Sequence, residues 1–209
     1  LAALLQRKHR PGKAFAVMVA SVEEARALCE VNDAEARQLT SPARPIVLLR
    51  KRSDATFAKG LADNLPELGV MLPTTPVQHL LLHECGGMLV MTSGNIHDEP
   101  IVIDEETAFS QLAGVADAFL VNNREIVGRY DDSVIRILNG GAAGDIVQFI
   151  RRARLCAASR FSSVPRRRKR RAFGSRSRAE KHANLCACWQ GVCFPACGRP
   201  GERPHLRFL

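Results

Sequence analysis

A short run of small polar residues has the composition of a site for a phosphorylated ligand. Thr92-Ser93-Gly94-Asn95 directly follows the apolar run 88–91, which we expect to be a buried strand. Hydroxyl and amide groups beside a glycine give closely spaced donors at the carboxyl end of a strand, where open α/β sheets bind ligands. An ordinary strand-to-helix turn uses the same residue types, so both interpretations stay open. Residues 1–154 contain no G-x-x-x-x-G-K-S/T loop.

Basic side chains lie at two further places that could meet a phosphate. Lys8, Arg10 and Lys13 crowd together just before the first expected strand. Cations at that spacing can neutralise a phosphate chain, although a solvated basic stretch has the same pattern. Arg136 alternates with apolar residues on the last expected strand and so could face the same cleft.

Acidic and histidine pairs offer possible metal ligands. Asp98-Glu99 and Asp131-Asp132 could hold a metal that arrives with a nucleotide, or they could cap helices and turns. His79 and His83 are four residues apart, which is a zinc-ligand spacing on a helix. No third ligand is near them in the sequence, so we interpret them as surface or boundary histidines.

Alternating strands and helices must position these groups. Apolar runs predict strands at 15–19, 45–49, 68–72, 88–91, 118–121 and 133–138. Helices are expected from a capping box at Ser21 to about residue 30, from a cap at Asp33 to Thr40, from a cap at Thr75 to Gly86, and over 104–112. The inner stripe of the third of these helices is predicted to be Val77, Leu80, Leu81 and Cys85. This order predicts an α/β domain with a mixed, twisted and largely buried sheet.

Charge divides the chain at residue 154. Residues 1–154 hold 17 Lys and Arg against 19 Asp and Glu, whereas residues 155–209 hold 13 against 2. The second part also holds the single Trp and five of the seven cysteines. Cys29 and Cys85, in the first part, suit small core positions in a reducing cytoplasm. No apolar run approaches the ~18 residues of a membrane span, and we expect no membrane association.

Five segments, taken in order, resemble a known family. They are Lys8-His-Arg-Pro-Gly-Lys-Ala-Phe, Thr40-Ser-Pro-Ala-Arg-Pro-Ile-Val, Leu68-Gly-Val-Met-Leu-Pro-Thr-Thr-Pro, Thr92-Ser-Gly-Asn-Ile-His-Asp-Glu-Pro and Asp131-Asp-Ser-Val-Ile-Arg. Together they resemble the Sua5/YciO/YrdC (YrdC-like) domain, in the version found within HypF-type carbamoyltransferases of nickel–iron hydrogenase maturation. The resemblance covers nearly all of residues 1–154, and Arg151-Arg-Ala-Arg154 is typical of the HypF version.

The resemblance implies a function that composition does not show. HypF-type proteins use carbamoyl phosphate and ATP to form carbamoyl adenylate in this domain, and a later domain passes the carbamoyl group to a C-terminal cysteine of the partner HypE. Carried over to this sequence, Lys8 and Arg10 hold phosphate and Ser133 and Arg136 complete the pocket. The nucleotide and Mg²⁺ site is then lined by Thr92, Ser93 and Asn95.

Two positions depart from the pattern. Thr74 stands where the family usually has Tyr, and His97 where it usually has Ser. Both flank the expected cleft, which puts the fit of the substrate there in doubt. The chain has no initiator Met, and we expect a fragment whose YrdC-like domain lacks its front. Such a fragment is expected not to complete carbamoyl transfer.

Residues 155–209 have the pattern of an out-of-frame translation. Family members continue after Arg-Arg-Ala-Arg with Gly-Tyr-Ala-Pro, and codons for Leu155-Cys-Ala-Ala encode that string when read one base out of register. Stretches 176–182 and 198–208 shift in the same register to strings that resemble the next HypF domain. We therefore expect this tail to be disordered or poorly packed.

Two features of the tail imitate functional sites. The cysteines at 186, 188, 193 and 197 have irregular spacing, so zinc is not expected. The basic run 166–171 would bind polyanions in a salt-dependent way whatever its origin. YrdC-like folds have been linked to double-stranded RNA, so a double-stranded RNA-binding module is the alternative to an enzyme fragment, together with a relative of threonylcarbamoyl-AMP synthase. A nonfunctional product of a damaged gene is the third hypothesis.

Overall fold

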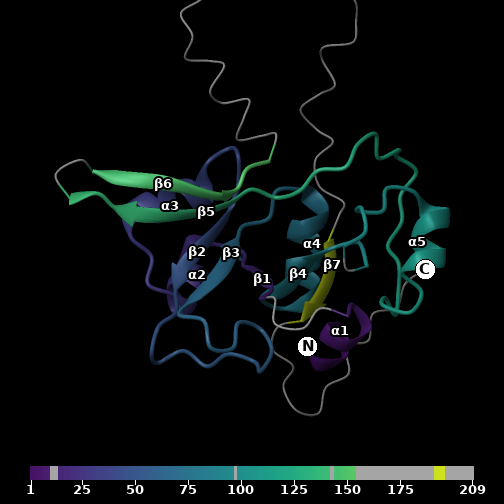
Figure 1. Cartoon of the computed structure of the whole chain (residues 1–209), viewed down its shortest axis with the longest axis horizontal. Coiled ribbons are helices and arrows are strands. Elements are labelled where there is room, and N and C mark those ends of the chain that lie inside the picture. Colours follow the sequence, from purple (N-terminus) through teal and green to yellow (C-terminus); the bar gives the residue numbers. More distant parts are fainter. Residues whose placement is uncertain (10–13, 97, 142–143, 154–190, 196–209) are drawn as a thin grey trace, which may run out of the picture.

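One sheet with helices on both faces organises the computed structural model (Figure 1). The structure describes residues 1–9, 14–96, 98–141 and 144–153, and the backbone of 191–195. In the part of the chain so described, no helix is long and apolar enough to cross a membrane. In chain order the elements are α1 (Ala2–Arg7), β1 (Ala16–Met18), α2 (Val22–Leu28), α3 (Asp33–Thr40), β2 (Ile46–Arg50), β3 (Glu67–Met71), α4 (Pro76–Cys85), β4 (Leu89–Ser93), α5 (Glu105–Gln111), β5 (Val134–Asn139), β6 (Asp145–Arg151) and β7 (Gly191–Pro195).

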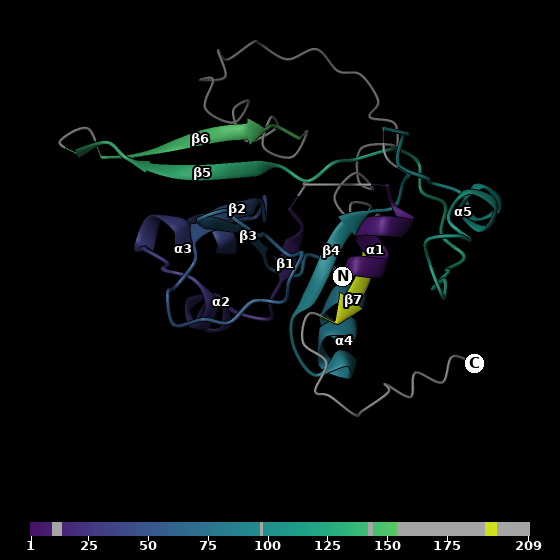
Figure 2. The ribbon, with the colours of Figure 1, turned by 60° about the horizontal axis from the view of Figure 1, so that its bottom comes forward.

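The sheet is mixed, and its strand order is β6-β5-β2-β3-β1-β4-β7. β1 is parallel to β3 and β2 is parallel to β5, whereas the other neighbouring strands are antiparallel. This confirms the α/β class with a mixed sheet. β5 and β6 form a hairpin that extends away from the body of the molecule, while α5 lies at the opposite end (Figures 1 and 2).

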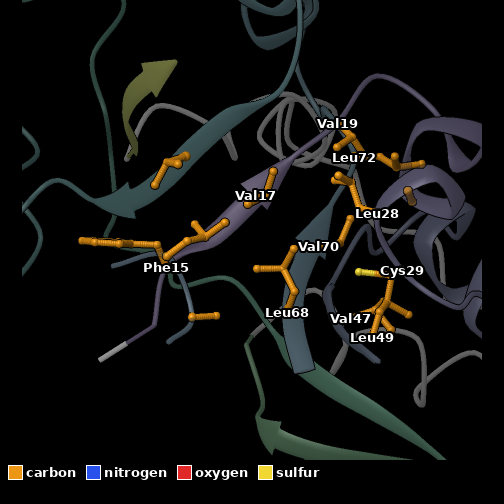
Figure 3. Close-up of a cluster of buried hydrophobic side chains, with 14 of the residues drawn as sticks. Phe15, Val17, Val19, Leu28, Cys29, Val47, Leu49, Leu68, Val70 and Leu72 are labelled. Carbon is orange, nitrogen blue, oxygen red and sulfur yellow. The ribbon is translucent and has the colours of Figure 1, made fainter. Parts of the chain in front are cut away.

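Side chains alternate between the two faces of each strand and so build two apolar clusters. On one face, Val17, Val47 and Val70 are fully buried, and Leu28 and Leu39 of α2 and α3 pack against them. Figure 3 shows side chains of the central strands, such as Val17, Val47 and Val70, packed with Leu28 of α2. The other face carries a smaller, methionine-rich cluster beneath α4, which contains Met18, Met71, Leu82, Leu89 and Met91.

Local capping explains where the helices begin and end. Ser21 Oγ accepts from the Glu24 backbone N–H at the start of α2, and Thr75 Oγ1 accepts from the Gln78 N–H at the start of α4. α4 ends at Gly86, whose left-handed φ of 67° suits a residue without a Cβ. The cap of α3 is Asn32 and not the predicted Asp33, because Asn32 Oδ1 accepts from Glu35 N while Glu35 bonds back to the Asn32 N–H.

Two sequence predictions about packing are wrong. The buried leucine of α4 is Leu82, at 4% exposure, whereas Leu80 is 62% exposed. The predicted stripe is therefore correct in part: Leu81 and Cys85 pack, partly buried, against the methionine cluster, but Leu80 is exposed and Leu82 takes the buried position. Residues 118–121 form no strand: Phe119 instead packs edge-to-face on Phe109 of α5, with 5.0 Å between ring centroids, and Leu120 stays exposed.

Cys29 and Cys85, the cysteines whose side chains the structure describes, are free thiols. Cys29 lies in the larger core cluster, and burial raises its pKa to about 12. Cys85 packs, partly buried, against the methionine cluster. Both therefore take the apolar packing positions expected from the sequence.

Most of the tail lies outside the described residues. Within it, the backbone of 191–195 forms β7, which pairs antiparallel with β4 from Leu89 to Ser93. The cysteines at 156, 186, 188 and 197 and the basic run 166–171 belong to the part that is not described.

Candidate functional site

An open pocket of about 220 Å³ lies on the methionine-bearing face of the sheet. Ala16, Gly69 and Leu48 form the middle of its floor, and they are neighbours across β1, β3 and β2. A Cβ on Gly69 would lie 3.1 Å from Ile46 Cγ2, closer than ordinary packing allows. Small residues at the centre of the sheet therefore leave the hollow, while Ile46 and Met71 stand around it.

The Thr92–Asn95 loop forms one rim of this pocket at the end of β4. Thr92 and Ser93 line the pocket. Ser93 Oγ donates to Asn95 Oδ1 at 2.5 Å, and Asn95 Nδ2 donates to the Glu99 carbonyl at 2.8 Å. The Val102 N–H also bonds to the Gly94 carbonyl at 2.9 Å. These bonds fold the loop back on itself, so its hydroxyl and amide groups are held at the strand end.

Lys8 is joined to this loop from the far end of the sequence. Lys8 is only 2% exposed. Its Nζ donates to Thr92 Oγ1 at 2.9 Å and to the Ser93 carbonyl at 2.6 Å. A buried ammonium requires such acceptors because it has lost its hydration. Lys8 follows directly after α1, so the contact fixes the end of that helix against the end of β4.

The opposite wall comes from the segment before β5 and the end of β6. Asp131, Asp132 and Arg151 line it. Arg151 Nε donates to the Asp132 carbonyl at 2.9 Å, and its Nη1 lies 3.6 Å from Asp131 Oδ1. Ser133 is buried, and its Oγ accepts from the Ala153 N–H at 3.0 Å. These contacts fix residues 131–133 against the end of β6 and the residues just after it.

Asp132 has a perturbed carboxyl group. Nearby protein atoms limit its hydration and raise the pKa of the carboxyl, while the Arg151 guanidinium opposes that rise. The side chain keeps substantial contact with solvent, so we expect the rise to be small.

Arg136 lies on the same sheet face as the pocket but beyond its lining residues. It is two residues along β5 from Val134, which lines the pocket, and its Nη2 donates to Glu67 Oε2 of β3. Lys8, Thr92, Ser93 and Asn95 are thus brought together on one side of the pocket, with Ser133 on the other and Arg136 beside the floor. Arg10 lies outside the described residues.

The remaining candidates lie apart from this arrangement. Thr74 is exposed, and its N–H and hydroxyl both bond to Gln78 Oε1. His97 is outside the described residues, and His79 and His83 are exposed on α4. Among the described residues, no group of three His, Cys, Asp or Glu side chains could hold a metal ion. The two acidic pairs therefore do not combine into one metal-binding cluster.

Sequence reasoning did not select Arg151 as a site residue. Its signal was present, because Arg151 begins the Arg-Arg-Ala-Arg string that is typical of the HypF version. Its position on the pocket wall depends on β6 pairing with β5, where Arg151 stands opposite Val134.

A family model for the Sua5/YciO/YrdC domain, described as telomere recombination, matches residues 1–153. The chain belongs to the Sua5/YciO/YrdC family. The matched range contains every described element except β7, and it includes all of the pocket.

Relatives of this Sua5/YciO/YrdC domain include carbamoyltransferases. The chain is 48% identical over 170 residues to carbamoyltransferase HypF2 of Cupriavidus necator, covering 74% of this chain and 21% of that protein. It is 47% identical over 134 residues to carbamoyltransferase HypF of Rhodobacter capsulatus, covering 64% of this chain and 18% of that protein. The chain therefore spans about a fifth of the length of these curated relatives.

Solved structures agree with this assignment. A crystal structure of full-length HypF in the phosphate- and nucleotide-bound form is 49% identical, with a TM-score of 0.69, over 74% of this chain and 24% of that one. Pyrococcus abyssi Sua5, at 16% identity and a TM-score of 0.59, covers 73% of this chain and 43% of its own, and shows the shared fold alone.

Proposed function

We propose that this Sua5/YciO/YrdC domain binds ATP and carbamoyl phosphate and belongs to a HypF-type carbamoyltransferase of hydrogenase maturation. In the complete enzyme, a later domain passes the carbamoyl group of the carbamoyl adenylate formed here to the C-terminal cysteine of HypE. The new bond forms between the cysteine sulfur and the carbamoyl carbon, and AMP leaves. The observation that carries the proposal is the contact of Lys8 with the Thr92–Asn95 loop at the rim of the pocket, in a chain 48% identical to a carbamoyltransferase.

The residues around the pocket suit adenylate formation. That reaction needs little covalent help from a protein, since positioned cations and donors around the phosphates supply most of the catalysis. Lys8 and Arg10 are proposed to hold phosphate, and Thr92, Ser93 and Asn95 to orient the nucleotide. Ser133 and Arg136 are proposed to complete the pocket.

Mg²⁺ fits this arrangement when a nucleotide brings it. Mg²⁺ usually takes one or two carboxylates together with substrate phosphates, and does not require an all-protein cage. The Asp131 and Asp132 carboxylates on the pocket wall are suited to hold it. When bound, the ion would neutralise charge on the phosphate oxygens.

Calorimetric titration of the full chain with ATP tests the proposal. The wild-type chain is expected to bind ATP. Lys8→Met and Asn95→Ala should each weaken that binding about tenfold or more, because each variant removes a donor from the rim proposed to face the phosphates. Lys59→Met is the matched control, since Lys59 is exposed and does not line the pocket. A wild-type chain that binds no ATP would contradict the proposal.

We also propose that the functional domain is residues 1–154 and that residues 155–209 are read out of frame. The end of the family match at residue 153 supports this boundary. Sequencing of independent template DNA across codons 154 and 155 tests it. A one-base insertion or deletion relative to the genomic copy is expected, and an intact frame would refute the frameshift.

Binding of double-stranded RNA is a second candidate function, which the charge of residues 155–209 favours. These residues carry 13 Lys and Arg against 2 Asp and Glu. RNA binding that depends on them should vanish when they are deleted and should fall steeply with salt. Nucleotide binding should survive the same deletion, which separates the two candidates.

A further inference from the structure

Arg136 reaches across a whole strand to meet its partner. β2 lies between β5, which carries Arg136, and β3, which carries Glu67. The ion pair between Arg136 Nη2 and Glu67 Oε2 therefore spans β2 on one face of the sheet. Val134 and Gly69, each two residues from one member of the pair, both line the pocket, as does Leu48 of β2. The pair thus lies beside the pocket floor.

The guanidinium of Arg136 is incompletely satisfied by Glu67. Its Nε is buried and has no hydrogen-bond partner among the described residues. A buried donor without an acceptor raises the free energy of the arrangement that contains it. The pair is not sealed from solvent, since the side chains of Arg136 and Glu67 are 36% and 27% exposed. An anionic group that enters from the neighbouring pocket would therefore meet a guanidinium that one carboxylate oxygen holds through Nη2 alone.

Arg151, which lines the pocket, is also held by an acidic residue. Arg151 lies against Asp131 on the wall, as Arg136 lies against Glu67 beside the floor. Each carboxylate offsets the attraction of its arginine for an anion. A phosphate or carboxylate group of a ligand must then compete with the carboxylate for the guanidinium, whereas an uncharged ligand need not.

We propose that Glu67 is the resting partner of Arg136 and competes with an anionic group of the ligand for its guanidinium. Glu67 thereby lowers the affinity of the pocket for anionic ligands and leaves its affinity for neutral ones unchanged. This inference rests on the proposed function, because it takes the pocket to be a site for phosphorylated ligands.

The test compares Glu67→Gln with a matched control in the full chain. Glu30→Gln removes the same charge from an exposed pair, in which Glu30 Oε2 lies 3.9 Å from Arg50 Nε, and neither residue lines the pocket. Calorimetry with ATP and with adenosine gives the affinities. Glu67→Gln is expected to bind ATP about fivefold more tightly and adenosine within about twofold of wild type. Glu30→Gln should match wild type for both ligands.

A double-mutant cycle identifies the partner through which Glu67 acts. In an Arg136→Gln background, Glu67→Gln should no longer change ATP affinity, because the contested guanidinium is absent. Thermal unfolding of each variant checks that it folds. If Glu67→Gln does not fold, Glu67→Asp replaces it, since the shorter carboxylate holds Arg136 less well and should tighten ATP binding by about twofold.

Each remaining outcome overturns the inference. Unchanged or weaker ATP binding by Glu67→Gln, with intact wild-type binding, would leave the pair a purely structural cross-strand contact and would spare the proposed function. An equal gain for adenosine would exclude competition for charge. A wild-type chain that binds no ATP overturns the proposed function and this inference together.

Discussion

Lys8 Nζ donates to Thr92 Oγ1 over 2.9 Å, although 84 positions separate the two residues in the chain. The bond joins the end of α1 to the end of β4 and places a cation against the Thr-Ser-Gly-Asn loop. Two segments that were singled out independently in the sequence thus form one rim of the pocket.

Replacement of Lys8 by Met should affect both binding and stability. Met has a similar length but cannot donate to Thr92 or to the Ser93 carbonyl. We expect a loss of about 1–3 kcal/mol in the free energy of unfolding, since buried acceptors lose their donor. Urea unfolding measures this loss. Lys59→Met should stay within about 0.5 kcal/mol of wild type, and an equal loss in both variants would argue against the buried bond.

Gly69→Ala should fill the floor of the pocket. The added Cβ meets Ile46 Cγ2 at 3.1 Å, so we expect a destabilisation of about 1–2 kcal/mol and weaker ATP binding. Gly114→Ala is the control, because nothing lies within 4 Å of its added Cβ. Calorimetry and thermal unfolding give the two readouts. Unchanged ATP affinity in a folded Gly69→Ala variant would place the ligand elsewhere.

The two leucines of α4 provide a matched test of its packing. Leu82→Ala should cost about 2–4 kcal/mol of unfolding free energy, because it leaves a cavity beside the methionine cluster. Leu80→Ala should cost less than about 0.5 kcal/mol, because Leu80 is already exposed. Chemical denaturation measures both, and the reverse order would mean that Leu80, and not Leu82, packs in the core.

Asp132 should make stability depend on pH in the direction opposite to a salt-bridged carboxylate. Its pKa is raised in the folded protein, so the folded state binds the proton more tightly than the unfolded state. Stability from this group is present below the ordinary Asp value of 3.8 and is lost as pH rises through the folded-state pKa. Asp132→Asn should therefore gain stability relative to wild type as pH rises from below 3.8 through the folded-state pKa of Asp132.

Asp104 should make stability depend on pH in the opposite direction to Asp132. Its carboxylate accepts from the Thr107 N–H at the start of α5, and the Thr107 contacts lower its pKa. Asp104→Asn should lose stability relative to wild type as pH rises from below the folded-state pKa of Asp104 to above its ordinary value of 3.8. Denaturation curves at several pH values measure both variants, and parallel pH profiles for the two would contradict the assignment.

Local features of the fold could be predicted because they depend on residues three or four positions apart. The Ser21 and Thr75 caps and the Gly86 helix end need only their own neighbours, and the structure has all three. The cap of α3 was misplaced by one residue, since Asn32 and Asp33 are both good caps and only the bond from Glu35 N decides between them.

The sequence by itself therefore determined the α/β class, the family and the type of most elements, because periodicity, capping and the loop motif depend on residues that are close together in the chain. Tertiary structure decided which residues meet. β6 becomes the sheet edge that carries Arg151 to the pocket, Arg136 crosses β2 to Glu67, and residues 118–121 form a loop. These outcomes depend on strand pairing and helix docking between distant segments, whose free energy no short window of sequence contains.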